Sequence, residues 1–127
     1  EERRRAAWRD RITGVSVAAA YDSTHPLTAG TERANEEGRL FVLHEEDLLF
    51  RPDPSYRTVV HFPGGGGAVA GRISDRKREE LEQGAWMVTR EEGDGRVILF
   101  ADDPLYRLFW RSTFHLVANA LLVGPAL

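Results

Sequence analysis

The sequence contains no cysteine among its 127 residues. This absence excludes a disulfide scaffold, a cysteine nucleophile and metal sites built from thiolates. Basic residues are not in excess either, since the formal net charge is −3, and we therefore expect no nucleic acid partner. The longest apolar run, Leu116 to Val123, is interrupted by Asn119 and is too short to span a membrane. Residues 1–11, mostly Arg and Glu, lack the apolar segment of a secretory signal.

Catalytic motifs are also missing from the sequence. None of the four histidines is followed by another at i+4 or begins the His-x-x-Glu segment that many zinc hydrolases use. No serine lies in a Gly-x-Ser-x-Gly setting. We interpret the acidic segment His44–Asp47 as a solvated loop and Gly64–Gly67 as a flexible surface loop, because the phosphate-binding motifs are incomplete. We therefore predict no catalytic residue, metal site or cofactor in this chain.

The residues that are present fit one domain over 1–127, with a charged lead-in over 1–12. Hydrophobic residues make up 42% of the chain and charged residues 29%, which is usual for a soluble globular protein. Alternating or apolar runs predict five main strands, at 15–21, 40–43, 58–62, 85–89 and 97–101. The strand at 97–101 is continuously apolar, so we expect it to be buried on both faces.

Helix and turn signals complete a mixed α/β pattern. Ser74 is a suitable N-cap for a helix over 75–83, and the glycines in 92–95 predict a tight hairpin turn. Asp103 is expected to cap a second helix that begins at Pro104 and runs to Val123. This second helix is apolar well beyond one stripe, and we expect it to be packed on more than one side.

Asp102 and Asp103 follow the strand at 97–101, where ligands bind in open α/β sheets. Two adjacent carboxylates could also act as acid and base. We favour a structural interpretation, in which Asp103 caps the helix and Asp102 pairs with Arg107 or Arg111. Ser112 and His115 are three residues apart, but a hydrogen-bonded histidine facing the core is favoured over a catalytic pair.

Several segments resemble bacterial zinc carboxypeptidase A-like proteins, the metallocarboxypeptidase family. The similar segments keep the family's order along most of the chain, and they are Arg9–Gly14, Asp22–Leu27, Ala70–Ser74, Gly95–Thr113 and Phe114–Gly124. In that family these segments lie in a C-terminal glutamine amidotransferase-like region, after the peptidase domain. The resemblance implies an α/β fold, a partial flavodoxin-like or amidotransferase-like three-layer sheet with a buried C-terminal helix.

This chain departs from the family pattern at three positions. Thr13 stands in place of the usual proline, Ser112 in place of glycine and His115 in place of arginine. The zinc ligands, the glutamate base of the peptidase and the cysteine of amidotransferases have no counterpart here. The resemblance therefore carries over no catalytic residue, and it implies that zinc belongs to the peptidase domain of a larger parent protein, of which this chain would be the C-terminal portion.

The resemblance implies a non-catalytic accessory domain of a zinc-dependent carboxypeptidase, which hydrolyses C-terminal residues from peptides. Its partner would be the parent peptidase domain or a second copy of the chain, and its location secreted or periplasmic. The residues that we expect to act as scaffold or interface are Asp102, Asp103, Arg107, Trp110 and Asn119. Two alternatives remain open: a small-molecule or glycan binding module near Asp102 and Asp103, and an independent hydrolase that uses Asp103 and His115.

Overall fold

The structure is a computed structural model, and it describes residues 1–9, 14–33, 39–45, 48–65, 68–82, 84–108 and 111–127. Its helices are α1 (Glu2–Arg9), α2 (Asp75–Leu81) and α3 (Arg111–Leu122), with short 3₁₀ turns η1 (Pro26–Thr28), η2 (Thr31–Arg33), η4 (Tyr106–Leu108) and η5 (Gly124–Ala126). Its strands are β1 (Val15–Tyr21), β2 (Arg39–His44), β3 (Arg57–His61), β4 (Ala68–Ala70), β5 (Ala85–Glu92) and β6 (Gly95–Phe100).

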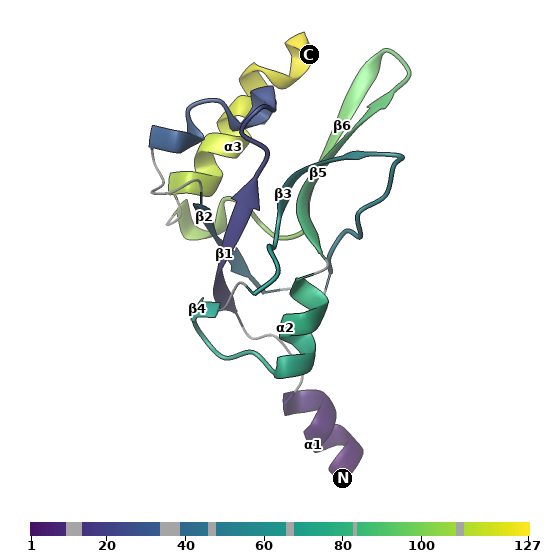
Figure 1. The fold of residues 1–127 in the computed structure, drawn as a ribbon, viewed down its shortest axis with the longest axis vertical. Coiled ribbons are helices and arrows are strands. Elements are labelled where there is room, and N and C mark those ends of the chain that lie inside the picture. The colour runs from purple at the N-terminus through teal and green to yellow at the C-terminus, as the bar shows by residue number, and fades with distance from the viewer. Residues whose placement is uncertain (10–13, 34–38, 46–47, 66–67, 83, 109–110) are drawn as a thin grey trace.

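The strands form one curled six-stranded sheet with the order β2-β1-β3-β5-β6. The short strand β4 lies off this order and pairs with the start of β1, whereas β3 pairs with its end. Helix α3 packs against this sheet (Figure 1), so the mixed α/β class and the C-terminal helix are confirmed. Each pairing between the described strands is antiparallel. A flavodoxin-like sheet is parallel, and these pairings do not confirm that finer part of the expectation. A tight turn such as the one between β5 and β6 can join only antiparallel strands.

Strand β1 and the β5–β6 hairpin match the sequence-based expectations. β1 has the predicted bounds, Val15–Tyr21, and its first three residues and its fifth are buried. The hairpin turns at Gly93, whose φ of 57° lies in the left-handed region that glycine adopts without strain. The predicted N-cap of α2 is also present, since the Ser74 hydroxyl accepts a hydrogen bond from the Lys77 amide.

Strand β6 corrects the expectation of a strand buried on both faces. Its residues alternate between exposed and half-buried, and β6 lies at the edge of the sheet. The side chain of Ile98 packs near Gly124, where an added Cβ would lie 3.2 Å from Ile98 Cδ1. The opposite face carries Val97 and Leu99, which are exposed. The apolar run therefore reflects one face covered by the C-terminal segment and one face left open.

The C-terminal helix begins later than the sequence predicted. After Pro104 the chain forms the 3₁₀ turn η4, in which Arg107 and Leu108 have φ values of 51° and 52°. Each left-handed non-glycine residue costs about 1 kcal/mol, and together they interrupt the helix before α3 starts at Arg111. The Asp103 side chain accepts the Leu105 amide at 2.9 Å, a local turn that competes with helix formation.

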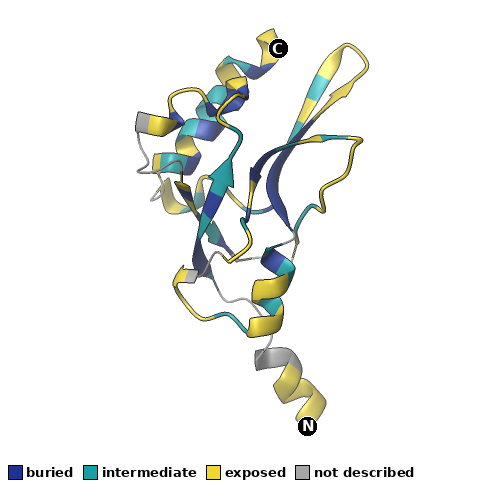
Figure 2. Ribbon diagram, viewed as in Figure 1, coloured by how far each residue is buried: buried dark blue, intermediate teal, exposed yellow. Residues whose placement is uncertain are grey.

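The core lies between the curled sheet and the elements packed on it (Figure 2). It contains alternate residues of β1 and β2 together with Trp86, Met87 and Leu116, all fully or nearly fully buried. Strand β4 was not predicted, and it follows the glycine-rich loop. Beyond it Gly71 has φ of 100°, and a Cβ there would lie 2.8 Å from the Gly14 carbonyl oxygen, so only glycine fits without a shift.

Candidate functional site

Asp102 is the buried centre of a hydrogen-bond network at the start of β5. Its Oδ2 atom lies 2.6 Å from His44 Nδ1 and accepts the Trp86 indole N–H at 3.0 Å. Its Oδ1 atom accepts the Glu45 backbone amide at 2.9 Å. The exposed fractions of the His44 and Asp102 side chains are 0% and 4%. The network joins the end of β2 to the segment that follows β6. Because β2 and β6 are the two ends of the strand order, these hydrogen bonds link the two edges of the curled sheet.

These contacts differ from the sequence-based interpretation of two segments. Asp102 was expected to pair with Arg107 or Arg111, whereas its described partners come from β2 and β5. His44 was placed in a solvated acidic loop, but it is completely buried. Its strand alternation with Leu40 and Val42 points it to the core. The Asp102 carboxylate supplies a partner for His44 Nδ1 there, while Nε2 has no hydrogen-bond partner among the described residues.

Asp103, Arg107 and Asn119, the other predicted residues that the structure describes, have partners of their own. Asp103 is exposed and binds the Leu105 amide, and Arg107 lies over the ring of Tyr106 at 5.2 Å. Asn119 donates to the carbonyl oxygens of Leu27 at 2.8 Å and of Ala29 at 2.9 Å. Trp110 lies outside the described residues.

Ser112 and His115 of α3 have separate partners. The Ser112 hydroxyl donates to the Phe41 carbonyl oxygen at 3.2 Å, and His115 Nε2 lies 3.0 Å from the Ala29 carbonyl oxygen. Together with Asn119, these side chains attach α3 to β2 and to the loop around η1. Their contacts are those of a helix-docking surface.

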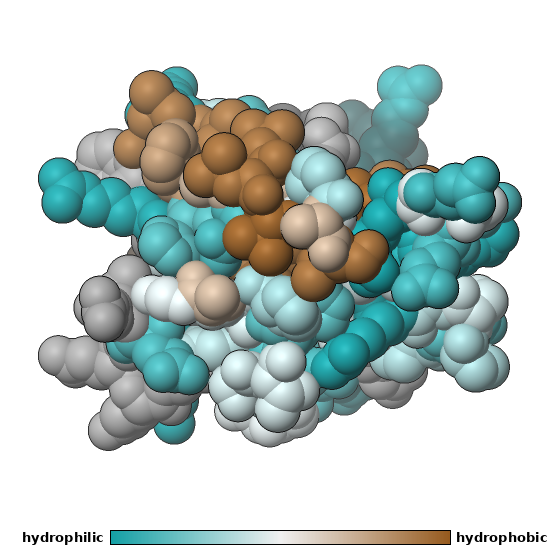
Figure 3. Space-filling model, turned by 90° about the horizontal axis from the view of Figure 1, so that it is seen from above, coloured by the Kyte–Doolittle hydropathy of each residue, from teal (hydrophilic) through white to brown (hydrophobic). Residues whose placement is uncertain are grey.

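The outer face of α3 is apolar and uncovered. Leu121 and Leu122 lie seven and eight positions after Phe114, about two helical turns further along the same side of the helix. The exposed fractions of the three residues are 52% for Phe114, 71% for Leu121 and 80% for Leu122. Thr113 and Leu116 are buried on the opposite side. Figure 3 shows apolar side chains gathered on the face seen from the C-terminal end. The expectation that this helix is buried on more than one side is therefore wrong for the chain by itself, because the sheet covers only one side.

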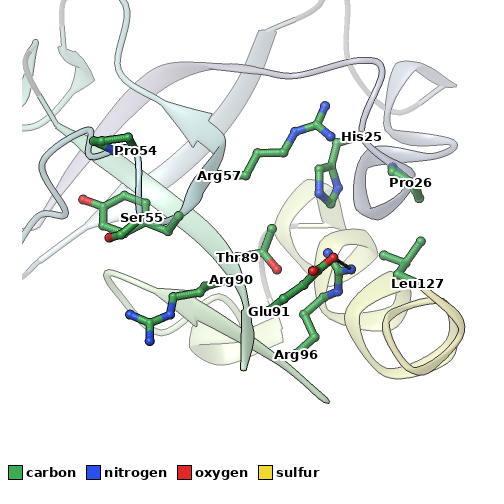
Figure 4. Close-up of a pocket in the computed structure, with 11 residues that line it drawn as sticks. His25, Pro26, Pro54, Ser55, Arg57, Thr89, Arg90, Glu91, Arg96 and Leu127 are labelled. Atoms are coloured by element: carbon green, nitrogen blue, oxygen red, sulfur yellow. Dashed lines mark hydrogen bonds and ion pairs between the residues drawn. The ribbon is translucent and has the colours of Figure 1, made fainter. Parts of the chain in front are cut away.

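A pocket with a volume of about 690 Å³ opens at the far end of β5 (Figure 4). Its lining combines three arginines and a glutamate with proline, tyrosine and leucine side chains, and it consists of His25, Pro26, Pro54, Ser55, Tyr56, Arg57, Thr89, Arg90, Glu91, Arg96 and Leu127. This volume is within the range of small-molecule sites. The sequence analysis did not identify this pocket.

Strand register explains why its polar residues meet. Arg57 pairs with Thr89 across β3 and β5, and Arg96 pairs with Glu91 across β5 and β6. Side chains two residues apart on a strand share a face, so all four residues project to one side of the sheet. Arg90 belongs to the other face, and in Figure 4 its side chain extends away from Arg96 and Glu91.

The arginines of the pocket make ion pairs with exposed or partly exposed carboxylates. Arg57 Nη2 lies 2.6 Å from Asp22 Oδ2, and Arg96 Nη2 lies 3.1 Å from Glu91 Oε1. The exposed fraction of the Arg96 side chain is 18%, whereas that of Glu91 is 80%. The Arg96 guanidinium is thus fixed among its neighbours, while the carboxylate that pairs with it is largely in solvent.

Two buried polar atoms of the pocket lining have no hydrogen-bond partner within the described part of the chain. They are the Thr89 hydroxyl oxygen and the Nε atom of Arg96. The exposed fraction of Thr89 is only 2%. A buried donor without an acceptor destabilises the fold, so an acceptor supplied from outside the described residues would stabilise these two groups.

His25 also lines the pocket. Its pKa is lowered, first by burial, then by the charge of Arg57 and to a smaller extent by Arg96, while Asp22 acts in the opposite direction. The Nδ1 atom of His25 accepts the Leu27 amide at 3.1 Å, which requires this nitrogen to be unprotonated. Both observations favour a neutral imidazole beside the arginines.

Neither a metal-binding arrangement nor a similar protein assigns a chemistry to these residues. Among the described positions, no group of three or more His, Asp or Glu residues is arranged to hold a metal ion. Within the same positions, no helix has the length and hydropathy that crossing a bilayer requires. In comparisons with protein-family models, curated proteins and solved structures, nothing matches this chain.

Proposed function

We propose that this chain is a non-catalytic accessory domain that docks on the peptidase domain of a zinc-dependent carboxypeptidase. The observation that carries the proposal is the uncovered apolar stripe of α3, formed by Phe114, Leu121 and Leu122. The resemblance in the C-terminal third supplies the identity of the partner. In this proposal zinc and the hydrolysis of C-terminal residues belong to the partner, and this chain covers it or shapes access to it.

The physical basis is the large exposed apolar area on a helix. Burying apolar surface contributes about 25 cal/mol per Å², and contiguous exposed apolar patches are typical of interaction surfaces. The open face of β6, with Val97 and Leu99, offers a second exposed apolar surface, on the side of the strand opposite to Ile98. A partner that covers the sheet would supply the missing layer of the amidotransferase-like three-layer arrangement, which belongs to the same proposal.

The alternatives from the sequence have less support. A ligand site beside Asp102 would compete with His44 and Trp86 for its oxygen atoms. A hydrolase that uses Asp103 and His115 would need them to act on one substrate, whereas each has its own backbone partner. No observation on the described residues favours either alternative over docking.

The test measures binding of the chain to the peptidase domain that the proposal places before it, by light scattering and calorimetry. We expect a one-to-one complex with the unaltered chain, and a loss of binding of at least about tenfold in the double variant Leu121→Glu, Leu122→Glu. Leu48→Glu is the matched control, since Leu48 is an exposed leucine with an exposed fraction of 59% in another segment. It should bind normally.

Three outcomes would contradict the proposal. The first is a reading frame without a peptidase domain upstream of residue 1, and the second is binding that the Leu121 and Leu122 changes leave intact. The third is a stable homodimer that the same double change dissociates, because the apolar stripe would then join two copies of the chain.

A further inference from the structure

The pocket at the end of β5 combines four features of an anion-binding site, independently of the docking proposal. It has a volume of about 690 Å³, it is lined by three arginines and one glutamate, and two buried polar atoms in its lining lack partners. Its apolar side chains include Pro26 and Leu127. A single inorganic ion would leave most of this volume unfilled, so the site fits an anionic group attached to an apolar body.

We propose that this pocket binds a small organic anion, whose carboxylate or phosphate group is held by Arg96, Thr89 and Arg57. The guanidinium of Arg96 presents planar N–H donors that match both kinds of oxyanion. The hydroxyl of Thr89 and the Nε–H of Arg96 supply the two donors that no described residue accepts. Arg57 of β3 pairs with Thr89 of β5 and adds positive charge on the same face of the sheet, where it also forms an ion pair with Asp22.

Glu91 occupies the position that the anionic group of the ligand would take. Its carboxylate reaches Arg96 through a single contact of 3.1 Å, and its side chain is 80% exposed. An exposed ion pair of this kind contributes little to stability, so the carboxylate can swing into solvent at small cost. The protein thus carries its own weak competitor, and removing it should strengthen binding.

The experiment is a titration of the full chain with phenyl phosphate and with phenylacetate, followed by calorimetry and ligand-observed NMR. Benzyl alcohol serves as the neutral analogue. The two anions share the apolar ring and differ in the oxyanion, so their relative affinity distinguishes a phosphate site from a carboxylate site. We expect saturable binding of at least one anion and none of the alcohol. An alcohol that binds as tightly as the anions would overturn the proposal.

Three variants locate the binding to this pocket. Arg96→Gln should weaken binding of the preferred anion at least about tenfold, and Thr89→Val about fivefold, because each removes a hydrogen bond to a charged group. Glu91→Gln should strengthen binding several-fold, since it removes the competing charge. A gain of affinity cannot arise from a misfolded variant, which keeps the test decisive if Arg96→Gln fails to fold.

Arg78→Gln provides the matched control. Arg78 lies on α2 with an exposed fraction of 45%, pairs with Asp75, and is not part of the pocket lining. This change removes one positive charge from the chain and should leave the affinity unchanged. The proposal is overturned if Arg78→Gln weakens binding as much as Arg96→Gln, or if neither anion binds.

Discussion

The two ends of β5 place charged groups in opposite situations. At the start of the strand, the Asp102 carboxylate is surrounded by donors from His44, Trp86 and the Glu45 amide, and it is nearly completely buried. At the end of the strand, Thr89 and Arg96 bring buried donors that have no acceptor among the described residues. One strand therefore joins a carboxylate whose two oxygen atoms both have hydrogen-bond partners to a pair of donors without an acceptor, although the Nε2 atom of the buried His44 also has no partner among the described residues.

This difference separates structural from ligand-binding polar groups. A buried polar group that has all its hydrogen bonds stabilises one arrangement of the chain. A buried donor without a partner lowers stability, and in a native structure it calls for an explanation such as a bound ligand, ion or water. The contrast predicts that changes to Asp102 will lower stability, while replacing the unpartnered Thr89 hydroxyl at the end of β5 will leave stability unchanged or raise it.

The largest effect is expected for Asp102→Asn. The change removes the charge and replaces one acceptor oxygen by an NH₂ donor, which would face a donor of His44, Trp86 or the Glu45 amide, and it should lower the free energy of unfolding by about 3 kcal/mol. Asp103→Asn is the matched control in the adjacent position, since asparagine can still accept the Leu105 amide, and should change stability by less than about 0.5 kcal/mol. Urea denaturation measures both. Equal losses in the two variants would remove the distinction between the buried and exposed carboxylates.

Asp22 tests whether charge at the pocket end also stabilises the fold. Hydrogen bonds from Thr24 and the Arg57 guanidinium lower its pKa from 3.8 to about 2. This carboxylate therefore stabilises the folded state above pH 3.8, and its contribution is lost as the pH falls toward 2. After allowance for its partial exposure, we expect Asp22→Asn to be less stable by about 1.5 kcal/mol at pH 7.

The pH dependence gives the control for Asp22. Urea midpoints of the parent chain and of Asp22→Asn should converge between pH 4 and pH 2, because the parent carboxyl is then protonated too. A difference that persists unchanged at pH 2 would show that the substitution acts through packing and not through charge.

Thr89→Val should stabilise the protein by about 1 kcal/mol, since a methyl group replaces a buried hydroxyl without a partner. The two side chains have nearly the same shape, and valine favours a strand. The measurement is a urea denaturation of both proteins without added anions. A loss of stability in this variant would mean that the hydroxyl is hydrogen-bonded in solution, and would remove the contrast between the two ends of β5.

His25 should give the smallest effect. Its lowered pKa means that the folded state binds a proton less readily than the unfolded state, so stability is complete above pH 6.5 and decreases as the pH falls below that value. NMR titration of the imidazole measures the pKa directly. An anion bound near Arg57 and Arg96 should raise it, because the anion offsets their charge. A pKa that does not respond to saturating anion would place the bound molecule elsewhere.

The sequence predicted elements whose signals are local. The alternation in 15–21 and the glycine-rich turn at 92–95 were sufficient for β1 and for the hairpin, because both depend on near neighbours in the chain. The start of α3 was misjudged, since the side chain of Asp103 and the left-handed residues Arg107 and Leu108 override an apolar pattern that favours helix. The resemblance and the function that it implies stay predictions.

Long-range contacts were beyond the sequence. The pairing of His44 with Asp102 joins residues 58 positions apart, and no local pattern identifies such a partner. The pocket depends on the register of β3, β5 and β6, which sets Arg57 opposite Thr89 and Arg96 opposite Glu91. Alternation shows that Thr89 and Glu91 share a face, but only the register shows which arginines join them.

The β5–β6 hairpin has a consequence for the order in which the chain folds. Its register is set by a turn at residues 93 and 94, so its closure costs little loop entropy, and hairpins of this kind form within about 1–10 μs. The contact between His44 and Asp102 must close a far longer loop and is expected to form late. Thr89, Glu91 and Arg96 would thus be brought together in the earliest structured segment, before the core that supports them is complete.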